Sequence, residues 1–351
     1  MMNKKEYILF YCFIALLIST AFIAIAVGAV PITFVDMFLS IKHWMNGEES
    51  GSIFEGVFIQ LRLPRVLLCG MSGAILAVSG VLMQGLFRNP IVEPGLTGTS
   101  AGAAFGASIV FVISAGLPIA LQNIIGVFIL PLFAFMGGLI ATYIVYSLSQ
   151  NSKQSSVTAL LLTGIAVNAV ALSGIGFMSY IARDPQARSI TFWNLGTFSG
   201  ASWFQVFIVG IIGIASFLFS FRFAKDLNIL QLGDEEAGYL GLNAQQLKKR
   251  ILLLNTIAVS VVTAFTGVIG FVGLIVPHIM RMIIGSNHKK LLPFSMIAGA
   301  VFLLLADIMA RTIAAPAELP IGIITSIIGA PLFILLLKKI GLLNQTGVKN
   351  D

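Results

Sequence analysis

The sequence predicts an all-α, polytopic membrane protein with about ten transmembrane helices. Of its 351 residues, 58% are hydrophobic and only 10% are charged, whereas about a quarter of the residues in a globular domain are charged. Apolar stretches of about 20 residues, the length that crosses the hydrocarbon core of a bilayer, recur almost from end to end. The 35 glycines suit helices that pack closely in lipid. We therefore expect one transmembrane domain over residues 1–351.

The first span is expected at about residues 8–30. Lys4 and Lys5 precede a charge-free run over 7–35, which is longer than the apolar region of about 7 to 15 residues in a signal peptide. No Ala-x-Ala site closes the run, so a retained helix is preferred over the alternative of a cleaved signal peptide. Further spans are expected at about 66–87, 97–115, 124–148, 155–181, 203–221, 291–310 and 321–338.

Residues 251–285 leave the number of spans open. They fit either one span with a surface helix or two short spans that turn near Gly267, Gly270 and Gly273. With two spans, 15 of the 21 lysines and arginines share the side of the N-terminus. With one span, five C-terminal lysines would change sides, against the positive-inside rule. Ten spans with both termini in the cytoplasm are therefore the better prediction.

A short internal repeat agrees with ten spans. Residues 65–68 (Arg-Val-Leu-Leu) open the second span, and 91–94 (Ile-Val-Glu-Pro) follow it. Residues 250–254 (Arg-Ile-Leu-Leu-Leu) open the seventh span, and 274–277 (Leu-Ile-Val-Pro) follow. Because these two spans run in opposite directions, the pattern is typical of an inverted repeat. The match is short, and chance similarity is the alternative.

The longest polar island in the apolar sequence covers residues 232–243. It contains three consecutive acids and faces the cytoplasm in the ten-span topology. We expect a short helix with breaks at Gly233 and Gly241, and a partner in the cytosol; the alternative is a solvated loop. An apolar face set among acids is typical of a docking helix. That face would consist of Ala237, Leu240 and Leu242.

This island resembles the coupling segment in the permease subunits of ABC importers for iron siderophores, haem and vitamin B12. Further motifs of that family recur in order along the chain. They are Leu61-Arg-Leu-Pro-Arg65, the run from Ser79 to Gly95 with Asn-Pro-Ile-Val-Glu-Pro-Gly at its end, Gly270-Phe-Val-Gly-Leu-Ile-Val-Pro-His-Ile-Met-Arg281, Ala306-Asp-Ile-Met-Ala-Arg311 and Pro316-Ala-Glu-Leu-Pro-Ile-Gly322. The likeness covers essentially the whole chain.

The resemblance implies a homodimer of ten-helix subunits in the cytoplasmic (inner) membrane. Two ABC ATPase subunits would grip the coupling segment, at about 228–248, and a periplasmic or lipid-anchored binding protein would deliver substrate. The sequence contains no Gly-x-x-x-x-Gly-Lys-Ser/Thr phosphate loop, so ATP and Mg are expected on the partner ATPase. We expect neither catalytic residues nor a cofactor on this chain, and no nucleic-acid partner.

The same resemblance assigns three groups of candidate site residues. The ATPase-coupling residues are Leu232, Gly233, Asp234, Glu235, Glu236, Ala237, Leu240 and Gly241. Of these, Ala237, Leu240 and Gly241 would fill a groove on the ATPase, while the three acids orient it at the rim. The residues that would dock the binding protein are Arg62, Arg65 and Arg311. The residues of the cytoplasmic gate would be Asn89, Ile91, Ser156, Val157 and Thr158.

Each group has an alternative explanation. The arginines would pair with glutamates of the binding protein, so we expect Arg65→Glu to weaken docking without affecting folding; interfacial snorkelling is the alternative. The gate serine and threonine could merely start a helix, and Val157 departs from the small hydroxylic residues common there. Asp307 and Arg311, four apart, are expected to pair.

Two kinds of site are not expected. His278 has no second ligand nearby in sequence, so a structural role is preferred over haem or metal ligation. Cys12 and Cys69 both lie in apolar spans and predict neither a disulfide nor a metal site. Residues 183–188 are expected to form a solvated loop.

Two other classes of membrane protein fit the sequence less well. An ion-coupled secondary transporter usually carries ionisable residues in the middle of its spans, and the first seven spans have none. A membrane enzyme would need a catalytic set of His, Cys or acidic residues. For the importer, the expected cargo is an iron chelate, haem or a ferric siderophore, with cobalamin as the alternative. A path that releases its cargo is expected to carry little binding chemistry.

Overall fold

A computed structural model describes residues 3–28, 33–46, 53–114, 117–118, 125–151, 154–155 and 157–339. The first half contains α1 (Lys4–Ala26), α2 (Phe34–Asn46), α3 (Ile53–Gly56), the π-helix η1 (Val57–Arg62), α4 (Leu63–Phe87), the 3-10 helix η2 (Pro94–Thr97), α5 (Thr99–Ser114), the π-helix η3 (Ile125–Ile129) and α7 (Leu130–Leu148). The second half contains α8 (Val157–Ile181), α9 (Asp184–Asn194), α10 (Trp203–Leu230), α11 (Asp234–Tyr239), α12 (Ala244–Thr266), α13 (Val272–Ile284), α14 (His288–Thr312) and α15 (Ile321–Lys339). Between α7 and α8, β1 (Gln150–Asn151) pairs with β2 (Gln154–Ser155) in an antiparallel hairpin.

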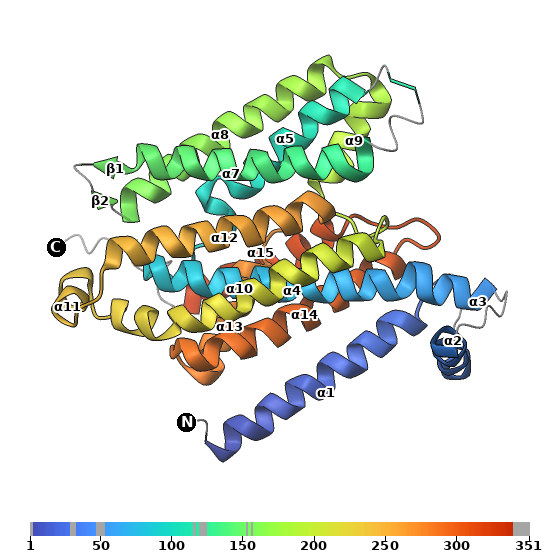
Figure 1. Cartoon of the computed structure of the whole chain (residues 1–351), viewed down its shortest axis with the longest axis horizontal. Helices are drawn as coiled ribbons and strands as arrows, with labels where there is room; N and C mark the ends of the chain where they lie inside the picture. The colour runs from blue at the N-terminus through green and yellow to red at the C-terminus, as the bar shows by residue number, and fades with distance from the viewer. Residues whose placement is uncertain are drawn as a thin grey trace, which may run out of the picture.

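The helices form two layers that meet along α12 (Figure 1). One layer consists of α5, α7, α8 and α9, and the other contains α1, α4, α10, α13 and α14. Helix α12 packs against α7 and α5 on one side and against α4 and α10 on the other. Because α4 also contacts α10, α13 and α14, it forms the centre of the larger layer.

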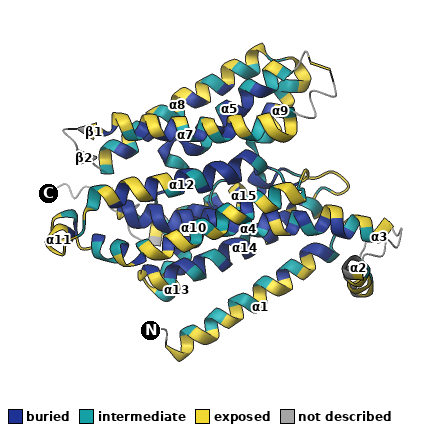
Figure 2. Ribbon diagram, in the orientation of Figure 1, coloured by how far each residue is buried: buried dark blue, intermediate teal, exposed yellow. Residues whose placement is uncertain are grey.

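Burial separates the central helices from the peripheral ones. Figure 2 shows dark, buried stretches along α4, α12 and α14, whereas α1, α8 and α10 are largely exposed. The exposed side chains on the peripheral helices are mostly large and apolar, for example Phe22, Leu162 and Leu218. A helix that is apolar on its exposed face requires an apolar solvent, so these faces suit contact with lipid.

Within the described ranges, seven helical segments are long and apolar enough to cross a membrane, and three apolar helices are shorter. The seven are Lys4–Ala26, Ile53–Phe87, Ile125–Leu148, Val157–Ile181, Trp203–Leu230, Ala244–Thr266 and His288–Thr312. The shorter three are Thr99–Ser114, Val272–Ile284 and Ile321–Leu336. The helical fold expected from the sequence is therefore confirmed. The predicted spans differ from the observed helices by several residues at some ends.

The uncertain region 251–285 contains two helices and no single long one. Helix α12 ends at Thr266 and α13 begins at Val272. Between them, Gly267 has a φ of 72°, in the left-handed region that glycine adopts without strain. Most of α13 is buried against α4 and α14, so it is not a surface helix. Of the two alternatives, the pair of helices is the one present.

Segments predicted to share a side of the membrane meet at the same end of the molecule. Near α11, Lys290 Nζ lies 2.7 Å from Glu6 Oε1 and joins the start of α14 to α1. Helices α2, α3 and α9 lie at the opposite end (Figure 1). The starts of α1 and α14 therefore lie at one end of the molecule with α11, and α2, α3 and α9 lie at the other.

Close helix crossings depend on glycine. Gly80 of α4 faces Gly273 of α13, and Gly73 of α4 faces Gly299 of α14. A Cβ atom at Gly80 would overlap the carbonyl oxygen of Gly273. Because the obstructing atom belongs to the backbone, a larger residue can be accommodated only if the helices move apart.

We predict that Gly80→Ala lowers the free energy of unfolding in detergent by about 1–3 kcal/mol, the usual cost of overpacking. Gly176→Ala on α8 is the matched control, because no atom lies within 4 Å of a Cβ built there. Denaturant unfolding of the two variants tests this. Equal stabilities would contradict the proposed backbone contact.

Candidate functional site

The predicted coupling segment folds as a short helix between two glycines. Helix α11 begins at Asp234, and the preceding Gly233 has a φ of 131°. Gly241 follows the helix with a φ of 81°. Both values lie in the region where residues with a Cβ are strained. The helix and its two breaks are therefore as predicted.

The acids of α11 do not share one environment. Asp234 forms two ion pairs within the chain, with Oδ1 3.0 Å from Arg88 Nη2 and Oδ2 2.6 Å from Lys248 Nζ, while its side chain stays 38% exposed. Glu235 and Glu236 are exposed. The ion pairs of Asp234 tie α11 to the ends of α4 and α12, and the role of the three acids at the rim of an ATPase groove stays a prediction.

The apolar residues of the segment also separate into two groups. Ala237 is fully buried in the core of this chain, so the prediction that it fills a groove on a partner is wrong. Leu240 is 61% exposed, Leu232 is 62% exposed and Tyr239 is 90% exposed. Sequence reasoning overlooked Tyr239, although it is the single aromatic residue in the polar island.

A buried polar cluster joins the approach to α11 with α14. His288, the first residue of α14, is fully buried. Its backbone N–H and its Nδ1 lie 2.9 Å and 2.8 Å from Asn228 Oδ1 near the end of α10. Gln231 Nε2 donates to the Ser286 carbonyl at 3.2 Å. The segment that leads into α11 is thus fixed to the loop between α13 and α14.

Two of the predicted gate residues, Asn89 and Ile91, follow Arg88, which pairs with Asp234 of α11. Arg88 ends α4 with a left-handed φ of 49° and pairs with Asp234. Asn89 follows directly, and its Oδ1 accepts a hydrogen bond from the Ile91 N–H at 3.1 Å. The loop that carries Asn89 and Ile91 is therefore tethered to α11 through Arg88.

The second gate group lies at the start of α8. Val157 is half-buried against the core and Thr158 is exposed, whereas Ser156 lies outside the described residues. Among described residues, α8 meets the segment after α4 at Gly164, where a Cβ would overlap the Leu96 carbonyl oxygen. The described contacts do not bring Val157 or Thr158 to Asn89.

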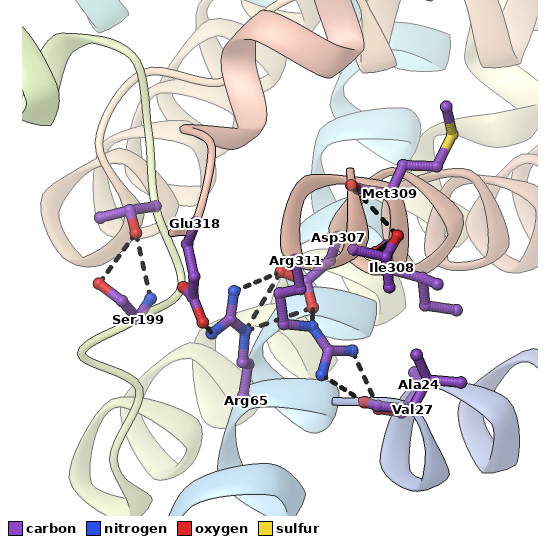
Figure 3. Close-up of polar contacts among 11 residues, drawn as sticks. Ala24, Val27, Arg65, Ser199, Asp307, Ile308, Met309, Arg311 and Glu318 are labelled. Carbon is purple, nitrogen blue, oxygen red and sulfur yellow. Dashed lines mark hydrogen bonds and ion pairs between the residues drawn. The ribbon is translucent and has the colours of Figure 1, made fainter. Parts of the chain in front are cut away.

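At the opposite end, two of the three candidate docking arginines, Arg65 and Arg311, pair with Asp307 (Figure 3). Arg65 Nη2 lies 2.9 Å from Asp307 Oδ1, and its Nη1 lies 2.8 Å from Glu318 Oε1. Arg311 Nε lies 3.0 Å from Asp307 Oδ2, which confirms the predicted pair four residues apart. Asp307 is 1% exposed, whereas Glu318 is 40% exposed.

Arg62 and Arg311 also complete the hydrogen bonding of α1. Arg311 donates to the carbonyls of Ala24 and Val27 at 2.9 and 3.0 Å, as Figure 3 shows. Arg62 donates to the carbonyls of Ile25 and Ala26. A helix leaves its last four carbonyls unpaired, and a cation is favourable there. These guanidinium groups therefore lie within the fold and do not snorkel to the interface.

The same arginines line a cavity of about 470 Å³. Its wall includes Arg62, Arg65 and Arg311, together with Glu318. Because Arg65 already pairs with Asp307, reversing its charge would place three carboxylates together. The expectation that Arg65→Glu leaves folding intact is therefore not supported by the structure.

Between the two ends of the molecule, side chains form hydrogen bonds with backbone groups that lack a helical partner at helix breaks. Glu93 Oε1 accepts a hydrogen bond from the Phe271 N–H at 2.9 Å, at the N-terminus of α13. Gln84 Nε2 donates to the carbonyls of Gly273 and Leu274. The first of these lacks its helical partner because Pro277 has no N–H. Sequence reasoning found no ionisable residue within the first seven spans and missed Glu93, which lies between helices yet inside the bundle.

His278 is buried in α13. Among the described residues, no group of three His, Cys, Asp or Glu side chains is placed to hold a metal ion, and a structural role for His278 stays a prediction.

We predict that Arg65→Glu lowers the free energy of unfolding by about 3–5 kcal/mol, because it leaves Asp307 buried without one of its partners. Arg188→Glu on α9 makes the same charge change at an exposed position and should change it by less than about 0.5 kcal/mol. Denaturant unfolding in detergent compares the two. Similar losses in both variants would contradict the structural role of Arg65.

Comparisons with known proteins agree on one family. The FecCD transport family matches residues 16–339. The chain is 40% identical over 301 residues to the hemin transport system permease protein HmuU of Yersinia pestis, covering 86% of this chain and 88% of the relative. It is 37% identical over 281 residues to the cobalamin import system permease protein BtuC of Halobacterium salinarum, covering 79% and 72%. A solved structure described as a metal-chelate type ABC transporter in an inward-facing conformation superposes with a TM-score of 0.81 at 30% identity, covering 94% of this chain and 99% of the other. This chain belongs to the FecCD transport family.

Proposed function

We propose that this chain is the transmembrane permease subunit of an ATP-driven ABC importer that moves an iron chelate, haem or a ferric siderophore, across the cytoplasmic membrane by alternating access. As a FecCD-family permease it is a transporter subunit of the inner membrane and not an enzyme. The observation that carries the proposal is the family match over residues 16–339. The similarity to a hemin transport permease supports an iron chelate.

In this proposal the seven long and three shorter apolar helices all cross the bilayer, and both termini lie in the cytoplasm with α11. Two observations support this orientation. Arg88, Lys248 and Lys290 form ion pairs at the α11 end, and basic residues are enriched on a cytoplasmic face. The two interrupted segments, after α4 and after α12, meet at Glu93 and Phe271, which is where an inverted repeat would bring its broken helices together.

We propose that α11 is the helix that docks onto the ATPase. Asp234 anchors the helix through Arg88 and Lys248, so that Tyr239 and Leu240 project from a fixed base. Exposed tyrosines such as Tyr239 are typical centres of a protein interface, and Glu235 and Glu236 would orient the partner at its rim. Movement of α11 would pull Arg88, and with it the loop of Asn89 and Ile91. That coupling supports a gate at the loop of Asn89 and Ile91, whereas Ser156, Val157 and Thr158 are included in the proposed gate on the resemblance alone.

At the outer end, we propose that the cavity lined by Arg62, Arg65 and Arg311 receives an acidic side chain of the substrate-binding protein. Arg65 Nη1 holds only the partly exposed Glu318 on that side. An incoming carboxylate would replace Glu318 there and form a charge-assisted pair. The complete importer would contain two copies of this chain, two ATPases that bind ATP and Mg, and the binding protein.

Two alternatives remain distinct from this proposal. Cobalamin is the alternative cargo, supported by the similarity to a cobalamin import permease. An ion-coupled secondary transporter is the alternative mechanism. It would function without an ATPase, so the dependence of uptake on ATP separates it from an importer.

We predict ATP-driven uptake of one of three labelled cargoes, haem, a ferric siderophore or cobalamin, into vesicles that hold the complete complex. Leu240→Asp should abolish this uptake, because a charge at the centre of an apolar contact leaves it desolvated and unpaired. Copurification of the ATPase with the permease should be lost at the same time.

The matched control is Lys249→Asp, which introduces the same side chain at an exposed position on the first turns of α12. It should retain both uptake and the ATPase. Wild-type uptake by Leu240→Asp would refute the role of α11. Uptake of a cargo without any ATPase would refute the importer.

We also predict that Glu318→Gln tightens docking of the binding protein by about 2- to 5-fold, because it removes the acid that competes for Arg65. Dissociation constants measured at low and high salt check this, and the gain should shrink at high salt. Asp184→Asn, at an exposed acid on α9, is the control for net charge. Weaker or unchanged docking by Glu318→Gln would count against the outer cavity as the docking site.

A further inference from the structure

A cavity of about 600 Å³ lies in the middle of the molecule, between α5, α8, α9 and the loop that precedes α13. Its wall is mainly apolar or small. Glu93 is the single charged side chain among the described residues that line it, and Asn168 is one of its amides. This contrasts with the outer cavity, which three arginines line. The charge of the chain's interior surfaces therefore changes sign between the outer end and the centre.

The carboxylate of Glu93 has spare capacity to accept hydrogen bonds. One oxygen accepts the Phe271 N–H at 2.9 Å, whereas an ionised carboxylate can accept about four. No lysine, arginine or histidine in the described part of the chain forms an ion pair with it. The nearest compensation is the N-terminus of α13, a helix of 13 residues, whose dipole favours a negative charge.

Asn168 adds a second unfilled acceptor to the same wall. It lies near the middle of α8, and its Oδ1 is buried without a hydrogen-bond partner in the described structure. A buried polar atom without a partner is costly. Two oxygen acceptors, one of them charged, thus face a cavity whose described lining contains no cationic side chain.

We propose that this cavity is a transient binding site on the translocation path, where it binds a cationic or hydrogen-bond-donating group of the cargo. The inference rests on the proposed transport function and narrows its substrate class. Beside a largely apolar protein wall, a carboxylate attracts cations and donors and repels anions more strongly than in bulk solvent. Cargoes that present amide, hydroxyl or amine groups are therefore favoured, and polyanionic chelates and small oxyanions are disfavoured. The central path carries more binding chemistry than the sequence suggests.

The test measures charge selectivity inside the cavity without requiring the natural cargo. Asn168→Cys is introduced into the full-length chain with Cys12→Ala and Cys69→Ala, which remove its two free thiols. The protein is reconstituted in vesicles and treated with a cationic trimethylammonium-ethyl or an anionic sulfonatoethyl methanethiosulfonate. Each rate is divided by the rate of the same reagent with a free thiol in solution.

With Glu93 present, the normalised rate of the cationic reagent should exceed that of the anionic reagent by about tenfold or more. Adding Glu93→Gln should bring the two rates to within about 2-fold of each other. The glutamine oxygen can still accept the Phe271 N–H, so the fold at this point is retained. Glu235→Gln, on exposed α11, is the matched control and should leave the preference unchanged.

Three results would overturn the proposal: equal normalised rates with Glu93 present, a cationic preference that survives Glu93→Gln, or no modification by either reagent. Each would make Glu93 a purely structural cap of α13. None of them bears on whether uptake requires ATP, so this proposal can fail while the importer stands. A second measurement tests whether Glu93 contributes to transport in the complete complex. In vesicles with the complete complex, Glu93→Gln should slow uptake of the transported cargo while the ATPase still copurifies.

Discussion

The structure depends on one constraint: every backbone N–H and carbonyl inside an apolar environment needs a hydrogen-bond partner, because an unsatisfied group there costs several kcal/mol. Continuous helices meet this need themselves, and each interruption requires a side chain. Arg62 and Arg311 pair the last carbonyls of α1. Gln84 donates to the carbonyls of Gly273 and Leu274, in the turn before Pro277, and Glu93 accepts the Phe271 N–H at the start of α13. The buried polar residues are therefore first of all partners of the backbone.

This structural role explains why the functional surfaces are rigid. The ion pairs of Asp234 fix α11 to α4 and α12, and the contacts of His288 fix its approach to α14. A push on the exposed Leu240 would consequently be passed to α4, α10, α12 and α14 at once. If α11 couples to an ATPase as proposed, these direct contacts would pass on its movement, whereas a flexible loop would absorb it.

Charge is distributed unevenly along the axis of the molecule. The outer arginines are neutralised only in part, by Asp307 and Glu318, whereas the central cavity presents a carboxylate and an amide oxygen. A docking protein with an acidic side chain and a cargo with donor groups would thus meet different surfaces. The two proposed recognition steps would be separable, because the groups assigned to them line separate cavities.

The sequence by itself determined the all-helical membrane architecture, the approximate spans, the short helix between Gly233 and Gly241, and the family. These follow from hydropathy, charge and local motifs, which depend on residues close together in the chain. Tertiary structure decided the rest. It buried Ala237 and exposed Tyr239, because the side of α11 that faces the core depends on how α10 and α12 pack. It turned Arg62, Arg65 and Arg311 inward, because α1, 36 residues or more away in sequence from each hydrogen-bonded arginine, presents its unpaired carbonyls to two of them. It placed Glu93 beside Phe271, 178 residues further along. No local pattern encodes contacts over such separations.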